Sequence, residues 1–78
     1  MKFLQFIQDE GFTAVTFTPN GGKAVKLKLA DVPTDEDLYK QMKLTPTTIQ
    51  YYPFEREPYI HCQNENEVMK VKLHKIII

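Results

Sequence analysis

The chain ends with the segment Val68–Ile78, VMKVKLHKIII, and this segment decides the class of fold. Its part MKVKLH alternates apolar residues with lysine or histidine, which is the two-residue period of a strand with one buried face and one wet face. The alternation then stops at three consecutive isoleucines, Ile76, Ile77 and Ile78. A strand with one wet face should not end in this way, so we expect these isoleucines to be buried on both faces or covered by a partner.

A second strand precedes this segment and is its expected hairpin partner. Tyr59–Gln63 has strand-forming residues, and the polar run Asn64–Glu67 turns the chain into Val68. A register with Gln63 opposite Val68 brings apolar residues together on one face and polar residues together on the other. The pairs are Cys62 with Met69, Ile60 with Val71, His61 with Lys70, and Tyr59 with Lys72.

Another hairpin is predicted in the N-terminal half of the chain. Phe12–Thr18 and Lys23–Ala30 are expected to be strands, and a three-residue loop, Asn20–Gly22, joins them. This loop length gives the register in which apolar residues meet apolar residues. The pairs are Phe17 with Val25, Val15 with Leu27, and Thr16 with Lys26. A further strand is expected over Thr47–Tyr52.

Two segments predict helices. Lys2–Glu10 carries apolar residues at helical spacing and is followed by Gly11, a typical residue after a helix C-terminus. The alternative for this segment is a hairpin that turns through Gly11. The second helix begins after Thr34, because Thr34 and Asp37 approximate a capping box and acidic residues fill the first turn. It ends before Pro46, since the residue before a proline avoids the helical region.

These elements predict a single α+β domain over residues 1–78. We expect a two-layer sandwich, with a mostly antiparallel sheet of four or five strands and one or two short helices on one face, in the order α-β-β-α-β-β-β. A small closed barrel with a helical insert is the alternative. A chain of 78 residues buries about 60% of its unfolded surface, so its core is thin and a deep substrate cavity would compete with it.

The charges of the chain balance, with ten basic and ten acidic residues and a pI of about 6.7. Arg56 is the only arginine, and arginine is the preferred side chain for phosphates and guanine edges. This composition argues against a general DNA-binding protein, although local cationic patches are compatible with it. Cys62 has no partner for a disulfide, and no signal peptide or membrane-spanning run is evident, so we expect a cytoplasmic protein without a membrane partner.

One candidate site is the wet face of the sheet. If both helices cover the other side, this face carries lysines together with aromatic and polar side chains. They are Lys26, Lys28, Tyr59, His61, Gln63, Lys70, Lys72 and His74. Lys26, Lys28, Tyr59, Lys70 and Lys72 form a candidate interface for single-stranded nucleic acid, through phosphate attraction and base stacking. The competing and favoured interpretation is an ordinary solvated face, because the net charge is zero.

The other candidate is a protein interface. Tyr51 and Tyr52 are neighbours on a strand and must face opposite ways, so one of them should be exposed, and exposed tyrosines are favoured interface anchors. Our leading hypothesis is a small non-enzymatic protein-binding module, such as a regulatory or inhibitor protein of a phage or mobile element. It would bind a protein partner, or a second copy as a homodimer, through the residues Tyr51, Tyr52, Tyr59, Ile76, Ile77 and Ile78.

No catalytic, metal or cofactor motif is present in the sequence. His61 and Cys62 face apart on a strand, no second cysteine gives a zinc spacing, and Cys62 is expected to be a core residue. The chain has no serine, which excludes a serine triad. Asp35, Glu36 and Asp37 are explained by the start of a helix, and Glu55 and Glu57 lie in a loop without sign of a pocket. We therefore expect neither an enzyme nor a cofactor.

Overall fold

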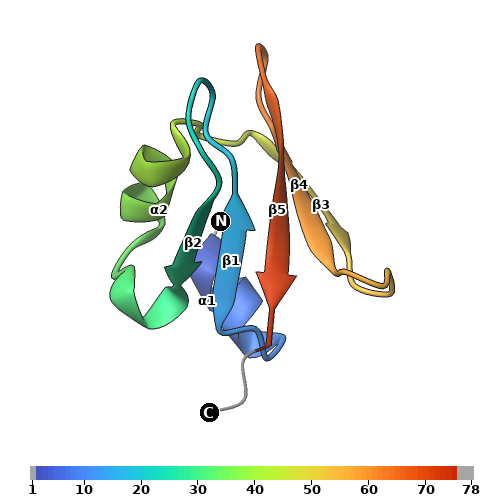
Figure 1. Cartoon of the computed structure of the whole chain (residues 1–78). Coiled ribbons are helices and arrows are strands. Elements are labelled where there is room, and N and C mark those ends of the chain that lie inside the picture. The colour runs from blue at the N-terminus through green and yellow to red at the C-terminus, as the bar shows by residue number, and fades with distance from the viewer. Residues whose placement is uncertain (1, 76–78) are drawn as a thin grey trace.

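A computed structural model describes residues 2–75 as one five-stranded antiparallel sheet with two helices (Figure 1). The element order is α-β-β-α-β-β-β, which confirms the predicted α+β fold. The helices and strands are α1 (Phe3–Asp9), β1 (Ala14–Phe17), β2 (Val25–Lys28), α2 (Asp35–Met42), β3 (Thr48–Tyr52), β4 (Tyr59–Gln63) and β5 (Val68–His74). A short 3-10 turn, Leu29–Asp31, follows β2.

Strand β5 lies at the centre of the sheet. The strand order is β2-β1-β5-β4-β3, so β5 pairs with β1 on one side and with β4 on the other. The sheet is open, with β2 and β3 at its edges, and this arrangement excludes the alternative of a closed barrel. Val68–His74 is therefore a central strand and not an exposed edge. The isoleucines Ile76–Ile78, on which the predicted interface depended, lie outside the described residues.

Both predicted hairpin registers are confirmed. Val15 lies opposite Leu27 in the first hairpin, and Ile60 lies opposite Val71 in the second. The predicted strand Lys23–Ala30 is too long, because β2 ends at Lys28 and the chain then turns. The alternation of apolar residues continues as far as Leu29, and for this reason the prediction extended the strand to that region. In the structure Leu29 is buried, but it belongs to the 3-10 turn and not to the strand.

The two helices cover the same face of the sheet. Figure 1 shows the sheet from its uncovered side, with α1 behind β1. The buried core joins residues of α1 and α2 to the inward residues of β1, β4 and β5, and partly buried residues of the edge strands β2 and β3 pack at its margin. Its largest fully buried side chains are Phe3, Ile7, Leu38 and Met42 from the helices, Leu29 from the 3-10 turn, and Phe17, Val15, Ile60, Cys62 and Val71 from the strands. Among residues 2–75, no helix is both long enough and apolar enough to span a membrane.

The helix α1 is confirmed over the alternative hairpin, and Gly11 ends it. Gly11 has φ +93, a left-handed conformation that costs glycine little. The Gly11 N–H donates to the Gln8 carbonyl, and the Phe12 N–H donates to the Ile7 carbonyl. These two bonds form a Schellman motif, in which Phe12 and Ile7 also share the hydrophobic core.

The start of α1 is stabilised from α2. The residue before α1, Lys2, makes no side-chain capping bond. Instead the Asp35 carboxylate accepts hydrogen bonds from the backbone N–H of Phe3 at 2.8 Å and of Leu4 at 2.9 Å. In α2 itself, the Thr34 hydroxyl accepts a bond from the Asp37 N–H, as the predicted capping box requires. One residue, Asp35, therefore joins the starts of both helices.

Candidate binding face on the open side of the sheet

The face of the sheet opposite the helices is called the outer face. Strand pairing assigns its members, because residues directly opposite each other across a pair share a face. All eight residues predicted for the wet face lie on it. The outer face comprises Ala14, Thr16, Lys26, Lys28, Thr48, Gln50, Tyr52, Tyr59, His61, Gln63, Val68, Lys70, Lys72 and His74.

One row of side chains crosses all five strands of the outer face. Lys26 lies opposite Thr16, Thr16 opposite Lys72, Lys72 opposite Tyr59, and Tyr59 opposite Tyr52. The row thus runs from lysine at the β2 edge to stacked tyrosines at the β3 edge. Since neighbouring strands are about 4.8 Å apart, the row is about 19 Å long.

An aromatic cluster occupies the β3 end of the row. The rings of Tyr52 and Tyr59 stack with centroids 4.9 Å apart and an interplanar angle of 24°. The His61 ring lies 5.4 Å from Tyr59 and 5.9 Å from Tyr52. The Lys70 ammonium lies 4.2 Å from the centre of the Tyr59 ring, within the range of a cation–π contact. The cluster fixes three rings and one cation on an otherwise uncovered surface.

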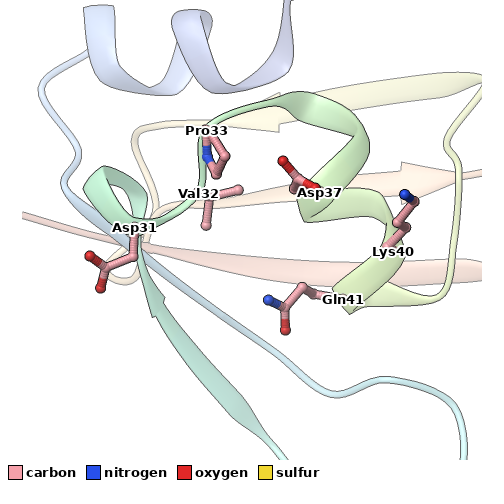
Figure 2. A pocket seen from close by; sticks show the side chains of 6 residues that line it. All are labelled: Asp31, Val32, Pro33, Asp37, Lys40 and Gln41. Atoms are coloured by element: carbon pink, nitrogen blue, oxygen red, sulfur yellow. The ribbon is translucent and has the colours of Figure 1, made fainter.

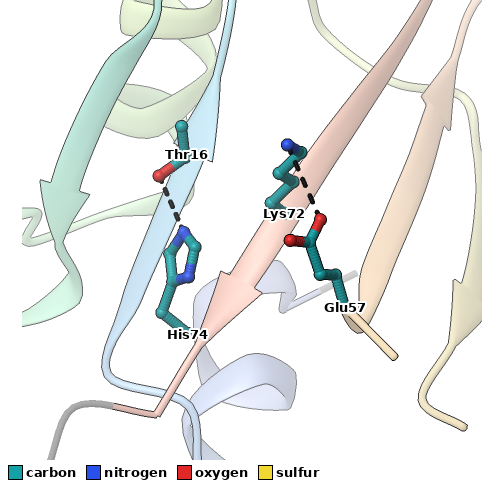
Figure 3. A network of polar contacts seen from close by, with 4 residues as sticks. All are labelled: Thr16, Glu57, Lys72 and His74. Atoms are coloured by element: carbon teal, nitrogen blue, oxygen red, sulfur yellow. Dashed lines mark hydrogen bonds and ion pairs between the residues drawn. The ribbon is translucent and has the colours of Figure 1, made fainter. Parts of the chain in front are cut away.

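Two polar contacts lie on the outer face beside this cluster (Figure 3). The Thr16 hydroxyl on β1 and Nε2 of His74 on β5 are 2.7 Å apart. The Lys72 ammonium lies 3.7 Å from a carboxylate oxygen of Glu57, in the connection between β3 and β4. Both partners of this ion pair are largely exposed, so the pair contributes little to stability and can exchange partners.

The pKa of His74 is lowered from its ordinary value of 6.5. Desolvation by burial is the largest cause, and the positive charges of Lys26 and Lys72 act in the same direction, whereas Glu57 opposes them. The histidine therefore stays neutral over more of the physiological range than an isolated imidazole would.

The charges of this neutral chain are divided unevenly between the strands and the helices. Among residues 2–75, no Asp or Glu occurs in any strand, whereas the strands contain both histidines and four lysines, Lys26, Lys28, Lys70 and Lys72. The helices and the 3-10 turn contain five acids, Asp9, Asp31, Asp35, Glu36 and Asp37, and one base, Lys40. Zero net charge consequently does not exclude a cationic binding face.

The structure separates the tyrosines of the predicted protein interface. Tyr52 and Tyr59 lie together on the outer face, but Tyr51 points to the helix side. There its ring contacts Phe6 edge to face at 5.0 Å, and its hydroxyl donates to the Glu10 carboxylate at 3.1 Å. Burial, then the hydrogen bond and charge of Glu10, raise the pKa of the Tyr51 hydroxyl. Tyr51 thus supports the packing of α1 against β3.

Sequence reasoning missed the stacking of Tyr52 on Tyr59. The signal was present, because a hairpin register with Ile49 opposite Cys62 places these two tyrosines opposite each other. It also missed Phe54, which is 99% exposed in the connection between β3 and β4. Phe54 borders a groove of about 470 Å³ on the helix side. The groove is also lined by Glu10, Phe12, Tyr51, Pro53, Pro58, Leu73 and Lys75.

Another hollow, of about 520 Å³, lies between the 3-10 turn and α2 (Figure 2). It contains two carboxylates, but Figure 2 shows that the side chains of Asp31 and Asp37 do not converge. Asp37 accepts a hydrogen bond from the Thr34 hydroxyl, which ties this acid to the start of α2. The hollow therefore lacks the paired groups that acid–base chemistry requires.

The lone thiol and the histidines do not form a reactive group with one another. Cys62 is fully buried, as predicted for a core residue, and burial raises the pKa of its thiol to about 12. A thiol with this pKa is a poor nucleophile at neutral pH. Within residues 2–75, no three side chains of the His, Cys, Asp and Glu types are grouped so that they can hold a metal ion.

Comparison of the chain with protein-family models, curated proteins and solved structures gives no match.

Proposed function

We propose that the protein is a non-enzymatic binding module whose outer face holds a single strand of nucleic acid. The observation that supports this function is the combination, on one uncovered face, of four lysines, a stacked aromatic cluster and no strand acid. The sequence alone favoured a protein partner, because the net charge is zero and the chain has a single arginine. We assign the activity to the cytoplasm, as expected for a chain with a single cysteine.

Two kinds of contact would hold the strand. Lys26, Lys28, Lys70 and Lys72 attract phosphates, and Lys72 can exchange its exposed ion pair with Glu57 for a phosphate. Bases stack on the rings of Tyr52, Tyr59 and His61, at about 1–3 kcal/mol for each stacked base. The outer face has no arginine whose guanidinium could make paired hydrogen bonds to a base. We therefore expect the protein to bind single strands of differing base sequence and to prefer them to duplexes.

The experiment measures fluorescence anisotropy of labelled oligothymidylate and oligouridylate at increasing salt. The double variant Lys28→Gln, Lys70→Gln should bind more weakly, and the slope of log affinity against log salt should become shallower by about 0.7 for each lysine removed. The double variant Lys2→Gln, Lys40→Gln is the matched control, since both lysines are exposed and lie outside the sheet. An equal loss of affinity in both double variants would show that binding depends only on the net charge of the protein and not on the outer face.

The aromatic contribution is tested within one strand. Tyr52→Leu should lower affinity by roughly fivefold to a hundredfold, the loss of one stacked base, whereas Tyr51→Leu on the opposite face should not. If the protein retains no single strand even at low salt, or captures only acidic proteins after nuclease treatment, the nucleic-acid function is wrong.

A second function, protein binding, is favoured by Phe54. A fully exposed phenylalanine beside an apolar groove is a typical interface anchor. A regulatory or inhibitor role would use this side of the molecule, opposite the outer face. Phe54→Ser should then weaken a protein complex and leave oligonucleotide binding unchanged.

A further inference from the structure

Within residues 2–75, the strand β3 is an edge strand whose own residues include neither the charges nor the proline that usually hinder pairing. Its sequence, TIQYY, has no charge, no proline and no glycine, and it consists of β-branched, aromatic and amide side chains. In the described part of the chain it pairs with β4 alone. Natural edge strands are usually blocked by lysine, proline, bulges or a covering segment.

The other edge of the same sheet carries that protection. Strand β2 is four residues long, and two of them, Lys26 and Lys28, are exposed lysines. A second copy added at β2 would bring like charges close together. The contrast between the two edges leaves β3 as the edge that can accept another strand.

We propose that β3 pairs antiparallel with β3 of a second copy, with Gln50 opposite Gln50 at the two-fold axis. This register places Tyr52 opposite Thr48 and Tyr51 opposite Ile49. The two residues of each pair point to the same face of the joined sheet, because their sequence positions differ by an even number. The half-buried Ile49 and Tyr51 then meet on the helix side, and the polar residues meet on the outer face. The strand is thus complementary to itself.

The geometry also limits the assembly to a dimer. Pro46 and Pro53 flank the strand and confine the new ladder to it, because proline lacks the N–H that a ladder needs. Pairing about a two-fold axis uses the β3 edge of both copies, so no β3 edge remains free for a third copy. The lysines of β2 hinder pairing at the other edge of the sheet. The result is one ten-stranded sheet with both outer faces on the same side. The proposal rests on β3 alone and does not depend on a nucleic-acid ligand.

Sedimentation equilibrium tests the dimer and its register together. The wild type should pass from the monomer mass of 9.1 kDa to twice that mass as concentration rises. Gln50→Lys and Gln50→Glu should each remain monomeric where the wild type is dimeric, because like charges then face each other at the axis. An equimolar mixture of the two variants should dimerise again, since opposite charges now meet.

Gln63→Lys and Gln63→Glu are the matched controls, because Gln63 is an exposed outer-face glutamine on the inner strand β4. Both should dimerise as the wild type does. The proposal is overturned by a wild type that stays monomeric up to about 1 mM, the weak limit of specific association. It is equally overturned if the Gln50 variants still dimerise, if their mixture stays monomeric, or if assembly continues beyond a dimer.

Discussion

At the scale of single residues, the outer face shows how neighbouring side chains take different roles. Tyr51 and Tyr52 are adjacent in sequence, yet Tyr51 packs against α1 and Tyr52 stacks on Tyr59. His61 belongs to the aromatic cluster, whereas His74 on β5 contacts Thr16 on β1. The environment of each side chain therefore depends on its position across the sheet.

His74 makes the stability of the fold depend on pH. Its pKa is lowered in the folded state from 6.5, so the unfolded chain takes up this proton more readily. As the pH falls through about 6.5, the free energy of unfolding should therefore decrease, and the decrease should level off below the folded pKa. Urea denaturation between pH 8 and pH 5, for the wild type and His74→Gln, measures this effect as the difference between the two curves.

The neighbours of His74 enter the same measurement. Lys26, Lys72 and Glu57 face this histidine and set its pKa together with burial. His61→Gln serves as the control, because it removes the other histidine of the outer face. A constant offset between wild type and His74→Gln at every pH would contradict the proposed role of His74.

At the scale of elements, the two helices depend on each other. The helix α1 has seven residues and neither an acidic residue in its first turn nor a capping side chain of its own. An isolated helix of this length is marginal in water. The bonds from Phe3 and Leu4 to Asp35 supply the missing cap from α2. The helix layer is therefore one unit, held by a carboxylate and by the core beneath it.

Replacing Asp35 should uncouple the helices. Asp35→Ala leaves two backbone N–H groups without an acceptor and should lower the free energy of unfolding by about 1–3 kcal/mol. Glu36→Ala is the matched control, since Glu36 is an exposed acid in the same first turn of α2. Chemical denaturation measures both variants. Equal losses of stability would mean that Asp35 acts only through the helix dipole.

At the scale of the whole molecule, β5 organises both the sheet and its charge. It has seven residues, pairs on both sides, and contributes Met69, Val71 and Leu73 to the core. Its alternate residues contribute Lys70, Lys72 and His74 to the outer face. Five of the ten acids lie in the helices and the 3-10 turn and none lies in a described strand, so the strands are cationic although the charges of the chain cancel.

This position predicts the pattern of local stability. Amide hydrogen exchange at Val71, in the middle of β5, should require global unfolding and show the largest protection. Amides of the edge strand β2, such as that of Lys26, should exchange through local opening with smaller protection. Native-state exchange at increasing denaturant distinguishes the two behaviours. Equal protection of β5 and β2 would contradict a fold organised around the central strand.

Local pattern was enough to predict the hairpins, the helices and the fold class. Thr34 with Asp37 marked the start of α2, and Gly11 marked the end of α1, because capping depends on residues close in sequence. Local sequence pattern could not predict a backbone conformation that the residue type does not indicate. Lys43 ends α2 at φ 60, in the left-handed region that usually takes glycine.

The sequence by itself determined which residues share a face, because the period of two and the hairpin loops assign each side chain within its own hairpin. The eight predicted wet-face residues were correct for this reason. Only the tertiary structure decided that β5 is central and that β3 is left as an unprotected edge. Those features depend on how separate hairpins and helices pack together. Hydrophobic burial drives that packing, and because it is non-directional, it does not by itself specify which strands become neighbours.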